Sequence, residues 1–469
     1  MLRLYHLGYH DFWYDEVYTI LQSRLVIADT WNAPLYYSII HYWTKLFGLS
    51  EFSLRFPSLI FSFLSVVLVF FLGKKILEVK SAALATLIMS LSSFQLWYAQ
   101  EARDYSLLLF IGLSATWFLY KALKEDSLKS WVYFVLISIS GFYTNYFYIF
   151  LFAAHLIYAL LLKIRRLDFK LTVSFLLIVL GFIPYLRRFL NKYFIVGQGF
   201  WILKPNYKSL VVTLQDLCLG STAPQPLYTL CIIVILVAFI IVLWNLYKNN
   251  SREGLLLCLA LFLVPVLGVF LFSRFVFSIY IDRGLIIASP YLYLILAYSL
   301  LRLKGKIRLL IIVSFIFMLA ISLYGYLNDL MFLSPKDRCG LHPKTSVKPL
   351  VDYLRTKIKE QDVIIFTNQS VILPFNFYSK DRRVPVYFLF DPSVNDEKWQ
   401  RPYKVSRFSL PVKNIKSIPF KRAWVIYTNW AKDGSLDENS QRVKSWMDLN
   451  LKEELKMEFD GSWLHRYSQ

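Results

Sequence analysis

Long apolar stretches without a charged residue recur along the first two thirds of the chain. A charge at the centre of a membrane helix costs about 2.5 to 3.5 kcal/mol, so runs of roughly 18 uncharged residues indicate membrane spans. Such runs occupy 56–73, 81–100, 105–120, 130–162, 171–186, 217–247, 254–273, 284–301 and 309–328. The run 130–162 is too long for one crossing, and we split it at Thr144-Asn145-Tyr146. The pattern predicts ten spans.

The chain after Pro335 follows a different pattern. Short β-rich runs at 363–366, 384–390 and 423–427 alternate with helical patterns such as 351–359, which is typical of a small α/β layer. We therefore predict a membrane-spanning domain at 1–334 and a soluble domain at 335–469. The expected fold class is an α-helical polytopic membrane protein of about ten transmembrane helices with a small C-terminal α/β soluble domain.

Basic residues gather in alternate loops. The loops after the first, third, fifth, seventh and ninth spans contain Lys74, Lys75 and Lys80; Lys121, Lys124 and Lys129; Lys163, Arg165, Arg166 and Lys170; Lys248 and Arg252; and Arg302, Lys304, Lys306 and Arg308. The positive-inside rule makes these loops cytoplasmic. We thus expect a multi-pass protein of the cell (inner) membrane, with the opposite loops and the C-terminal domain on the outer face. The aromatic-rich stretch 32–47 suits a helix lying in the membrane interface, although an ordinary connecting helix fits the same residues.

Composition narrows the function classes. The 469 residues are 57% hydrophobic and 18% charged, which excludes a disordered, collagen-like or disulfide-stapled chain. The net charge of +21 fits basic cytoplasmic loops and contact with membrane lipids better than a nucleic-acid partner. The four cysteines form no CxxC pair, so neither a zinc nor a redox motif is encoded.

Two segments on the predicted outer side combine carboxylates with aromatic residues. They are Asp11-Phe12-Trp13-Tyr14-Asp15-Glu16-Val17-Tyr18 and Trp97-Tyr98-Ala99-Gln100-Glu101-Ala102-Arg103-Asp104-Tyr105. Aromatic rings stack on the apolar faces of sugars, and carboxylates accept hydrogen bonds from their hydroxyl groups. A solvated loop within an interfacial aromatic belt, with Glu101 and Arg103 as a weak ion pair, explains the same spacing. Spacing alone leaves both interpretations open.

The order of motifs resembles a known family. W-Y-D-E-x-Y-T, then A-P-L-Y-Y-x-x-x-H-x-W-x-K-L-F-G-x-S-E-F-S-L-R-F-P-S, then W-Y-A-Q-E-A-R-D-Y-S-L closely resemble PMT-like glycosyltransferases of the GT-C superfamily, relatives of dolichyl-phosphate-mannose protein mannosyltransferases and of lipid A aminoarabinose transferase. The resemblance implies transfer of a sugar from a polyprenyl-phosphate-linked donor to a lipid, glycan or protein acceptor on the non-cytoplasmic face, usually with inversion. It gives Asp15 the position of the catalytic carboxylate, with Glu16 beside it.

The chain departs from the family pattern in three places. The family's first span is missing, Asn32-Ala33-Pro34 stands where many members have His-Pro-Pro, and Thr144-Asn145-Tyr146 stands where many have Thr-His-Tyr. The two absent histidines leave fewer potential metal ligands. The residues therefore specify no cofactor with certainty, and a bound divalent metal ion stays an open alternative. A catalytically inactive family member is a second reading of the same departures.

The expected chemistry assigns further residues. Phosphate is a fair leaving group, so the reaction needs a base for the acceptor hydroxyl, for which Asp15 is the candidate, and cations for the phosphate. Arg103 and Arg283 can bind phosphate through two parallel hydrogen bonds, and Gln100, Glu101 and Tyr105 are the other candidates for binding the donor. Arg187, Arg188 and Arg274 are further cations on the same side. The alternative function is a polyprenyl-lipid flippase or transporter.

Overall fold

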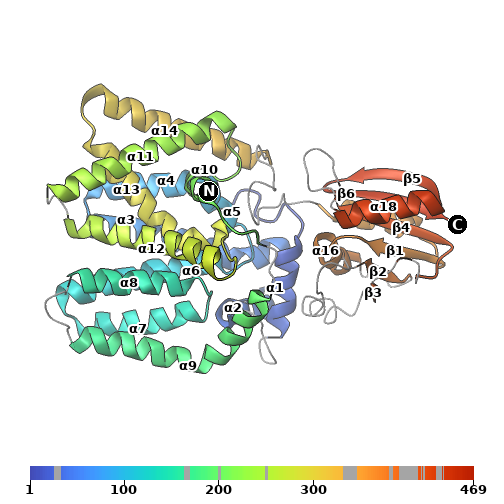
Figure 1. Cartoon of the computed structure of the whole chain (residues 1–469), viewed down its shortest axis with the longest axis horizontal. Helices are drawn as coiled ribbons and strands as arrows, with labels where there is room; N and C mark the ends of the chain where they lie inside the picture. Colours follow the sequence, from blue (N-terminus) through green and yellow to red (C-terminus); the bar gives the residue numbers. More distant parts are fainter. Residues whose placement is uncertain are drawn as a thin grey trace.

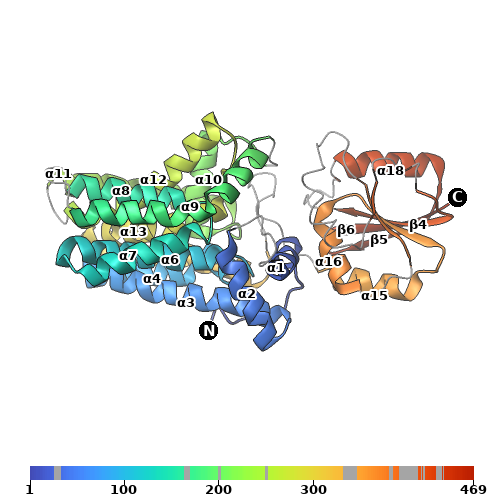
Figure 2. The ribbon, with the colours of Figure 1, turned by 90° about the horizontal axis from the view of Figure 1, so that it is seen from below.

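The computed structural model describes residues 1–25, 33–162, 169–198, 202–248, 252–330, 346–379, 384–389, 410–412, 415, 418–428, 436 and 438–469. Within these residues an elongated helical bundle lies beside a smaller domain built on a sheet (Figure 1). The two parts meet at one end of the bundle, where α1 (Tyr14–Arg24) faces α16 (Gln369–Ser379) (Figure 2). The predicted domain boundary between residues 334 and 335 lies outside the described residues.

The bundle begins with α1 and α2 (Pro34–Phe47). It continues with α3 (Glu51–Ile76), α4 (Val79–Leu91), α5 (Ser93–Ala99), α6 (Tyr105–Glu125), α7 (Leu128–Phe142), α8 (Tyr148–Leu162), α9 (Phe169–Gly197), α10 (Tyr207–Leu219), α11 (Gln225–Tyr247), α12 (Arg252–Phe275), the 3-10 helix η1 (Asp282–Ala288), α13 (Ser289–Arg302) and α14 (Gly305–Leu327).

The apolar helices occupy the ten predicted segments. Seven helices in the described residues are long and apolar enough to cross a membrane, counting η1 with α13 as one. The pair α4 and α5 is bent by 62° and accounts for one more segment, and the 15-residue helices α7 and α8 account for the last two. The division of the run 130–162 is confirmed, because α7 ends at Phe142 and α8 begins at Tyr148. The helix α2 covers most of the stretch predicted to lie in the interface, and that location stays a prediction.

Ion pairs join the predicted basic loops at one end of the bundle. The pairs are Lys75 with Glu125, Lys124 with Glu253, Lys170 with Asp126, and Arg302 with Glu78. Each of the five loops contributes a residue to this set, so the alternation of basic and non-basic loops corresponds to two opposite ends of the bundle. The segments around Asp15, Glu101 and Arg283 lie at the other end, next to the C-terminal domain (Figure 1).

The C-terminal domain is the predicted α/β layer. Its strands are β1 (Asp362–Phe366), β2 (Val386–Leu389), β3 (Leu410–Val412), β4 (Arg422–Thr428), β5 (Lys452–Phe459) and β6 (Ser462–Ser468), in the order β3-β2-β1-β4-β6-β5. Strands β1 to β4 pair in parallel, while β6 pairs antiparallel with β4 and β5. Within the described residues its helices are α15 (Lys348–Lys357), α16 and α18 (Glu438–Asn450).

Successive residues of a strand point to opposite faces of a sheet, and β1 shows the result. Val363 and Ile365 belong to a core with Val443 and Met447 of α18. Ile364 and Phe366 belong to a core that includes α15 and α16 and is continuous with the core of the bundle. The helices α15 and α16 therefore cover the face of the sheet opposite α18, and the C-terminal domain packs on the end of the bundle that carries α1, where α16 contacts α1 (Figure 2).

Candidate active site

The first carboxylate segment bends into α1. The helix begins after Trp13, so Asp15 and Glu16 both lie in its first turn, where the helix dipole favours negative charge. The Glu16 carboxylate accepts a hydrogen bond of 3.4 Å from the backbone N–H of Trp13, as in a capping box. Neighbouring residues in a helix point in different directions, so the two carboxylates have different surroundings.

Glu16 faces the interior of the bundle. Its carboxylate forms two parallel hydrogen bonds of 2.7 Å with the Arg55 guanidinium of α3, and both side chains are 1% exposed. The backbone N–H of Ala102 donates a further hydrogen bond of 3.0 Å to Glu16. The ion pair with Arg55 connects α1 to α3, and the hydrogen bond from Ala102 connects α1 to the second carboxylate segment.

Asp15 faces Arg103 and Arg283, the two arginines predicted to bind phosphate. Arg283 of η1 donates a hydrogen bond of 2.9 Å to Asp15, and Arg103 Nε lies 4.0 Å from the same oxygen. Both guanidinium groups also lie over the ring of Tyr105, at 5.8 Å for Arg103 and 5.6 Å for Arg283. The side chain of Asp15 is 15% exposed, so this carboxylate keeps some access to solvent that Glu16 lacks.

Glu101 is a buried carboxylate next to this cluster. Its side chain is 1% exposed, and neither oxygen has a hydrogen-bond partner among the described residues. Burial raises the pKa of Glu101 to about 8; Arg283 and Arg103 oppose this shift, while the negative charges of Asp15 and Glu16 add to it. A carboxylate buried without a hydrogen-bond partner is costly, which makes Glu101 a candidate for contact with a ligand.

Gln100 lies apart from the cluster. Its amide donates to the carbonyl oxygens of Arg3, at 3.1 Å, and Tyr5, at 2.6 Å, and its oxygen accepts a hydrogen bond of 2.5 Å from Tyr326. The structure thus brings Asp15, Glu101, Arg103, Tyr105 and Arg283 together and directs Gln100 to the N-terminal segment. Its predicted part in donor binding stays a prediction.

Three residues of the site were missed by sequence reasoning. Tyr37 and Thr19 accept hydrogen bonds of 3.3 and 3.5 Å from Arg103, and Lys192 of α9 lies within electrostatic range of Arg103. Tyr37 and Thr19 belong to the motif-bearing stretches, but their residue types carry no signal of their own. Lys192 follows closely after Arg187 and Arg188, which the charge pattern had placed on this side.

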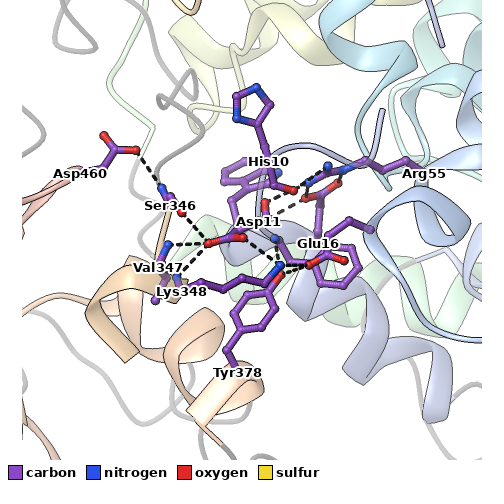
Figure 3. A network of polar contacts seen from close by, with 12 residues as sticks. His10, Asp11, Glu16, Arg55, Ser346, Val347, Lys348, Tyr378 and Asp460 are labelled. Carbon is purple, nitrogen blue, oxygen red and sulfur yellow. Dashed lines mark hydrogen bonds and ion pairs between the residues drawn. The ribbon is translucent and has the colours of Figure 1, made fainter. Parts of the chain in front are cut away.

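Asp11, the third carboxylate of the first segment, points to the C-terminal domain (Figure 3). It accepts hydrogen bonds from the Ser346 hydroxyl, at 2.7 Å, and from the backbone N–H groups of Val347 and Lys348, each at 2.9 Å. Burial alone would raise the pKa of Asp11, but these hydrogen bonds and the Lys348 ammonium hold it below its ordinary value. The three carboxylates of this eight-residue segment therefore have three different sets of partners: Asp11 contacts the C-terminal domain, Asp15 contacts Arg103 and Arg283, and Glu16 pairs with Arg55.

The metal question concerns the positions that replace histidines. Asn145 donates a hydrogen bond of 2.8 Å to Asp104 and accepts one of 2.9 Å from the backbone of Phe147, while Asn32 lies outside the described residues. Across the described part of the chain, no three His, Cys, Asp or Glu side chains converge as metal ligands would. The other candidate cations, Arg187, Arg188 and Arg274, are exposed on α9 and α12.

Comparison with known proteins places this geometry in context. Residues 32–186 match the family described as dolichyl-phosphate-mannose-protein mannosyltransferase. A comparison with curated protein sequences finds no match. Crystal structures of ArnT from Cupriavidus metallidurans are similar over 99% of this chain at 12% sequence identity: the apo state, with a TM-score of 0.60 over 94% of that chain, and the state bound to undecaprenyl phosphate, with a TM-score of 0.59 over 95%. The expected resemblance is therefore confirmed: the chain has the fold of ArnT and, over residues 32–186, the sequence pattern of the PMT-type membrane glycosyltransferases.

Proposed function

We propose that the protein is a membrane glycosyltransferase that moves a sugar from a polyprenyl-phosphate donor to a hydroxyl group of a lipid, glycan or protein acceptor. The observation that carries this proposal is the contrast between adjacent carboxylates. Glu16 is fully paired and buried, whereas Asp15 is partly exposed and lies against Arg103 and Arg283. Such a site offers a base and two cations at one point.

The reaction can be written for these residues as a single displacement. The acceptor oxygen attacks C1 of the sugar from the side opposite the phosphate, its proton passes to Asp15, and the bond between C1 and the phosphate oxygen breaks. The configuration at C1 is thereby inverted. Arg103 and Arg283 stabilise the charge that grows on the departing phosphate, which is where fixed cations accelerate such reactions. Glu16 acts as a positioning residue in this scheme, because its oxygens are engaged by Arg55 and Ala102.

The comparisons support a lipid-linked donor. ArnT of Cupriavidus metallidurans, which shares this fold, is known in a state bound to undecaprenyl phosphate, and the matching family is described by a dolichyl-phosphate-linked sugar. Two arginines beside one carboxylate at the end of an apolar bundle suit a phosphate whose prenyl chain remains in the membrane. A nucleotide-sugar donor would need no such placement.

The test is Asp15→Asn, which keeps the size of the side chain and removes the base. Purified protein in nanodiscs receives undecaprenyl-phosphate-linked hexoses and pentoses labelled in the sugar, with a membrane extract of the source cells as acceptor. We expect turnover to fall by roughly 100-fold or more. The control is Asp352→Asn, an exposed carboxyl on α15, which should transfer at the normal rate. Near-normal transfer by Asp15→Asn would refute the assignment of the base.

The same proposal places the site on the non-cytoplasmic face, because the ion-paired basic loops lie at the opposite end. Single cysteines at Ser127 and at Leu449, which is 85% exposed in the C-terminal domain, report the two sides in a variant whose native cysteines are serines. An impermeant thiol reagent should label position 449 in intact cells and position 127 only after lysis. The reverse result would invert the orientation.

A further inference from the structure

We infer that the C-terminal domain positions the catalytic carboxylate, and that it does so through Asp11. This inference rests on the proposed role of Asp15 as the base. Asp11 lies four residues before Asp15 in the same segment, and it contacts the first turn of α15, more than 330 positions further along the chain. Asp11 is a positioning residue in this account, because it acts through Asp15.

The contact has the form of a helix cap supplied from another domain. The first N–H groups of a helix lack partners within the helix. At α15 the N–H groups of Val347 and Lys348 donate to one oxygen of Asp11, and the Lys348 ammonium lies 3.1 Å from the other. The backbone N–H of Ser346 donates to Asp460 of the C-terminal domain itself (Figure 3). Asp11 is 5% exposed, so these charge-assisted hydrogen bonds are shielded from water.

A second set of contacts holds the next residue and the start of α3. The backbone N–H of Phe12 donates a hydrogen bond of 2.7 Å to the Tyr378 hydroxyl, and that hydroxyl donates one of 2.8 Å to Glu51. Lys348 lies 2.6 Å from the same Glu51 oxygen. The ring of Phe12 packs edge-on against Phe377, with centroids 5.4 Å apart. The C-terminal domain therefore contacts both the Asp11 segment and the first turn of α3.

Arg55 holds the segment from the other side. Its guanidinium donates to the backbone oxygens of Leu7, His10 and Asp11, at 2.9 to 3.0 Å, in addition to pairing with Glu16. Residues 7–16 are thus fixed between the bundle and the C-terminal domain, and Asp15 leaves this fixed segment toward Arg283. Release of the Asp11 contact leaves the Arg55 side of the clamp and the contacts of Phe12 with Tyr378 and Phe377. A shift of about 1 Å in a catalytic group can cost as much as 100-fold in rate.

The experiment compares Asp11→Ala, which removes the cap, with Asp11→Asn, which keeps an oxygen acceptor for the N–H groups. In the nanodisc assay with undecaprenyl-phosphate-linked sugars, we expect Asp11→Ala to lower turnover by about 10-fold or more, with less than about a twofold change in the donor concentration for half-maximal rate. Asp11→Asn should recover most of the turnover. Asp352→Ala, which alters an exposed residue of the same helix, should behave as the parent.

A double variant separates positioning from mere stability. Because Asp11 acts through Asp15, adding Asp11→Ala to Asp15→Asn should not reduce the residual turnover further. A role in folding alone predicts a further loss that parallels the loss of folded protein. If Asp11→Ala does not accumulate as folded protein, Lys348→Met, which removes only the ammonium part of the contact, takes its place. We then expect a smaller loss of turnover than for Asp11→Ala and again no further loss in the Asp15→Asn background.

The outcomes distinguish this inference from the proposed function. Inactive Asp15→Asn together with normal turnover by Asp11→Ala would overturn the inference and leave the base assigned. An additive loss in the double variant would also overturn it. Normal transfer by Asp15→Asn would overturn the proposed base, and with it the positioning role of Asp11.

Discussion

The two ends of the bundle use the same charged residue types in opposite ways. At the basic end, the ion-paired side chains between the loops are 37% to 67% exposed. Around α1 at the other end, the paired side chains of Glu16, Arg55, Asp15, Arg103 and Arg283 are 1% to 15% exposed. The first set is solvated and adds little to stability, whereas the second has been removed from water at considerable cost.

The difference in exposure between the two sets of ion pairs bears on the role of each end of the bundle. A buried ion pair is rarely more stabilising than an apolar pair of the same volume, so its presence calls for a reason other than stability. In the mechanism that we propose, that reason is placement: Arg55 fixes the segment before Asp15, and Arg283 and Arg103 provide cations where phosphate charge would develop. At the basic end the charges need only remain in water, as the positive-inside rule expects of cytoplasmic loops.

The sharpest test of this comparison breaks the buried pair. Arg55→Met leaves Glu16 buried without its cation, and removal of one partner of such a pair costs about 3 to 5 kcal/mol. We expect the temperature at which folded protein is lost in detergent to fall strongly. The matched control is Lys75→Met at the basic end, which should change it little. Similar shifts for the two variants would contradict the contrast between the ends.

A second prediction concerns how the cations are used. Arg283→Ala should raise the donor concentration for half-maximal transfer by about 10-fold, whereas Arg283→Lys should raise it less, because lysine keeps the charge and loses the two-pronged geometry. Kinetics with undecaprenyl-phosphate-linked sugars measure both. The control is Arg302→Ala, a cation of the basic end that also lies over an aromatic ring. Equal donor dependence for Arg283→Ala and the parent would remove this arginine from phosphate binding.

The pH dependence of stability tests the burial of Glu101. Its pKa is about 8 in the folded protein and ordinary, near 4.5, when unfolded, so between these values the folded state holds a proton that the unfolded state has released. Stability contributed by this group therefore falls as the pH rises from about 4.5 to 8. Glu101→Gln should lose that dependence and gain stability relative to the parent as the pH rises through this window. Thermal scans at pH 5 and pH 8 measure it, and equal slopes for both proteins would contradict the assignment.

The sequence predicted more of the fold than of the site. Hydrophobic runs and loop charges identified the ten apolar segments and the two ends, because membrane burial imposes the same requirement on every span. The motifs and the placement of their segments on one side selected Asp15, Arg103 and Arg283 as candidates, and the structure brings the three together. The charge pattern had no means of separating Glu16 from Asp15, because their difference depends on which side of one helical turn faces the interior.

Contacts between distant segments were the hardest to foresee. In the sequence, Arg55 is simply the charged residue directly before the first predicted span. Nothing near it in the chain indicates that it pairs with Glu16 and donates hydrogen bonds to three backbone oxygens. Asp11 likewise reads as part of an acidic cluster, although its partners lie in the C-terminal domain. Such pairings are set by the packing of whole elements, which a local pattern does not contain.

The smallest expected effect is at the basic end and completes the comparison. Lys124 pairs with Glu253 between two loops, and both side chains are more than a third exposed. Water and salt screen such a pair, so Lys124→Ala should change the free energy of unfolding by less than about 1 kcal/mol and transfer not at all. The measurement is thermal stability at about 0.05 and 0.5 M salt, where the difference between variant and parent should shrink as the salt rises. A loss as large as that of Arg55→Met, independent of salt, would mean that this end is also a buried, structural charge network.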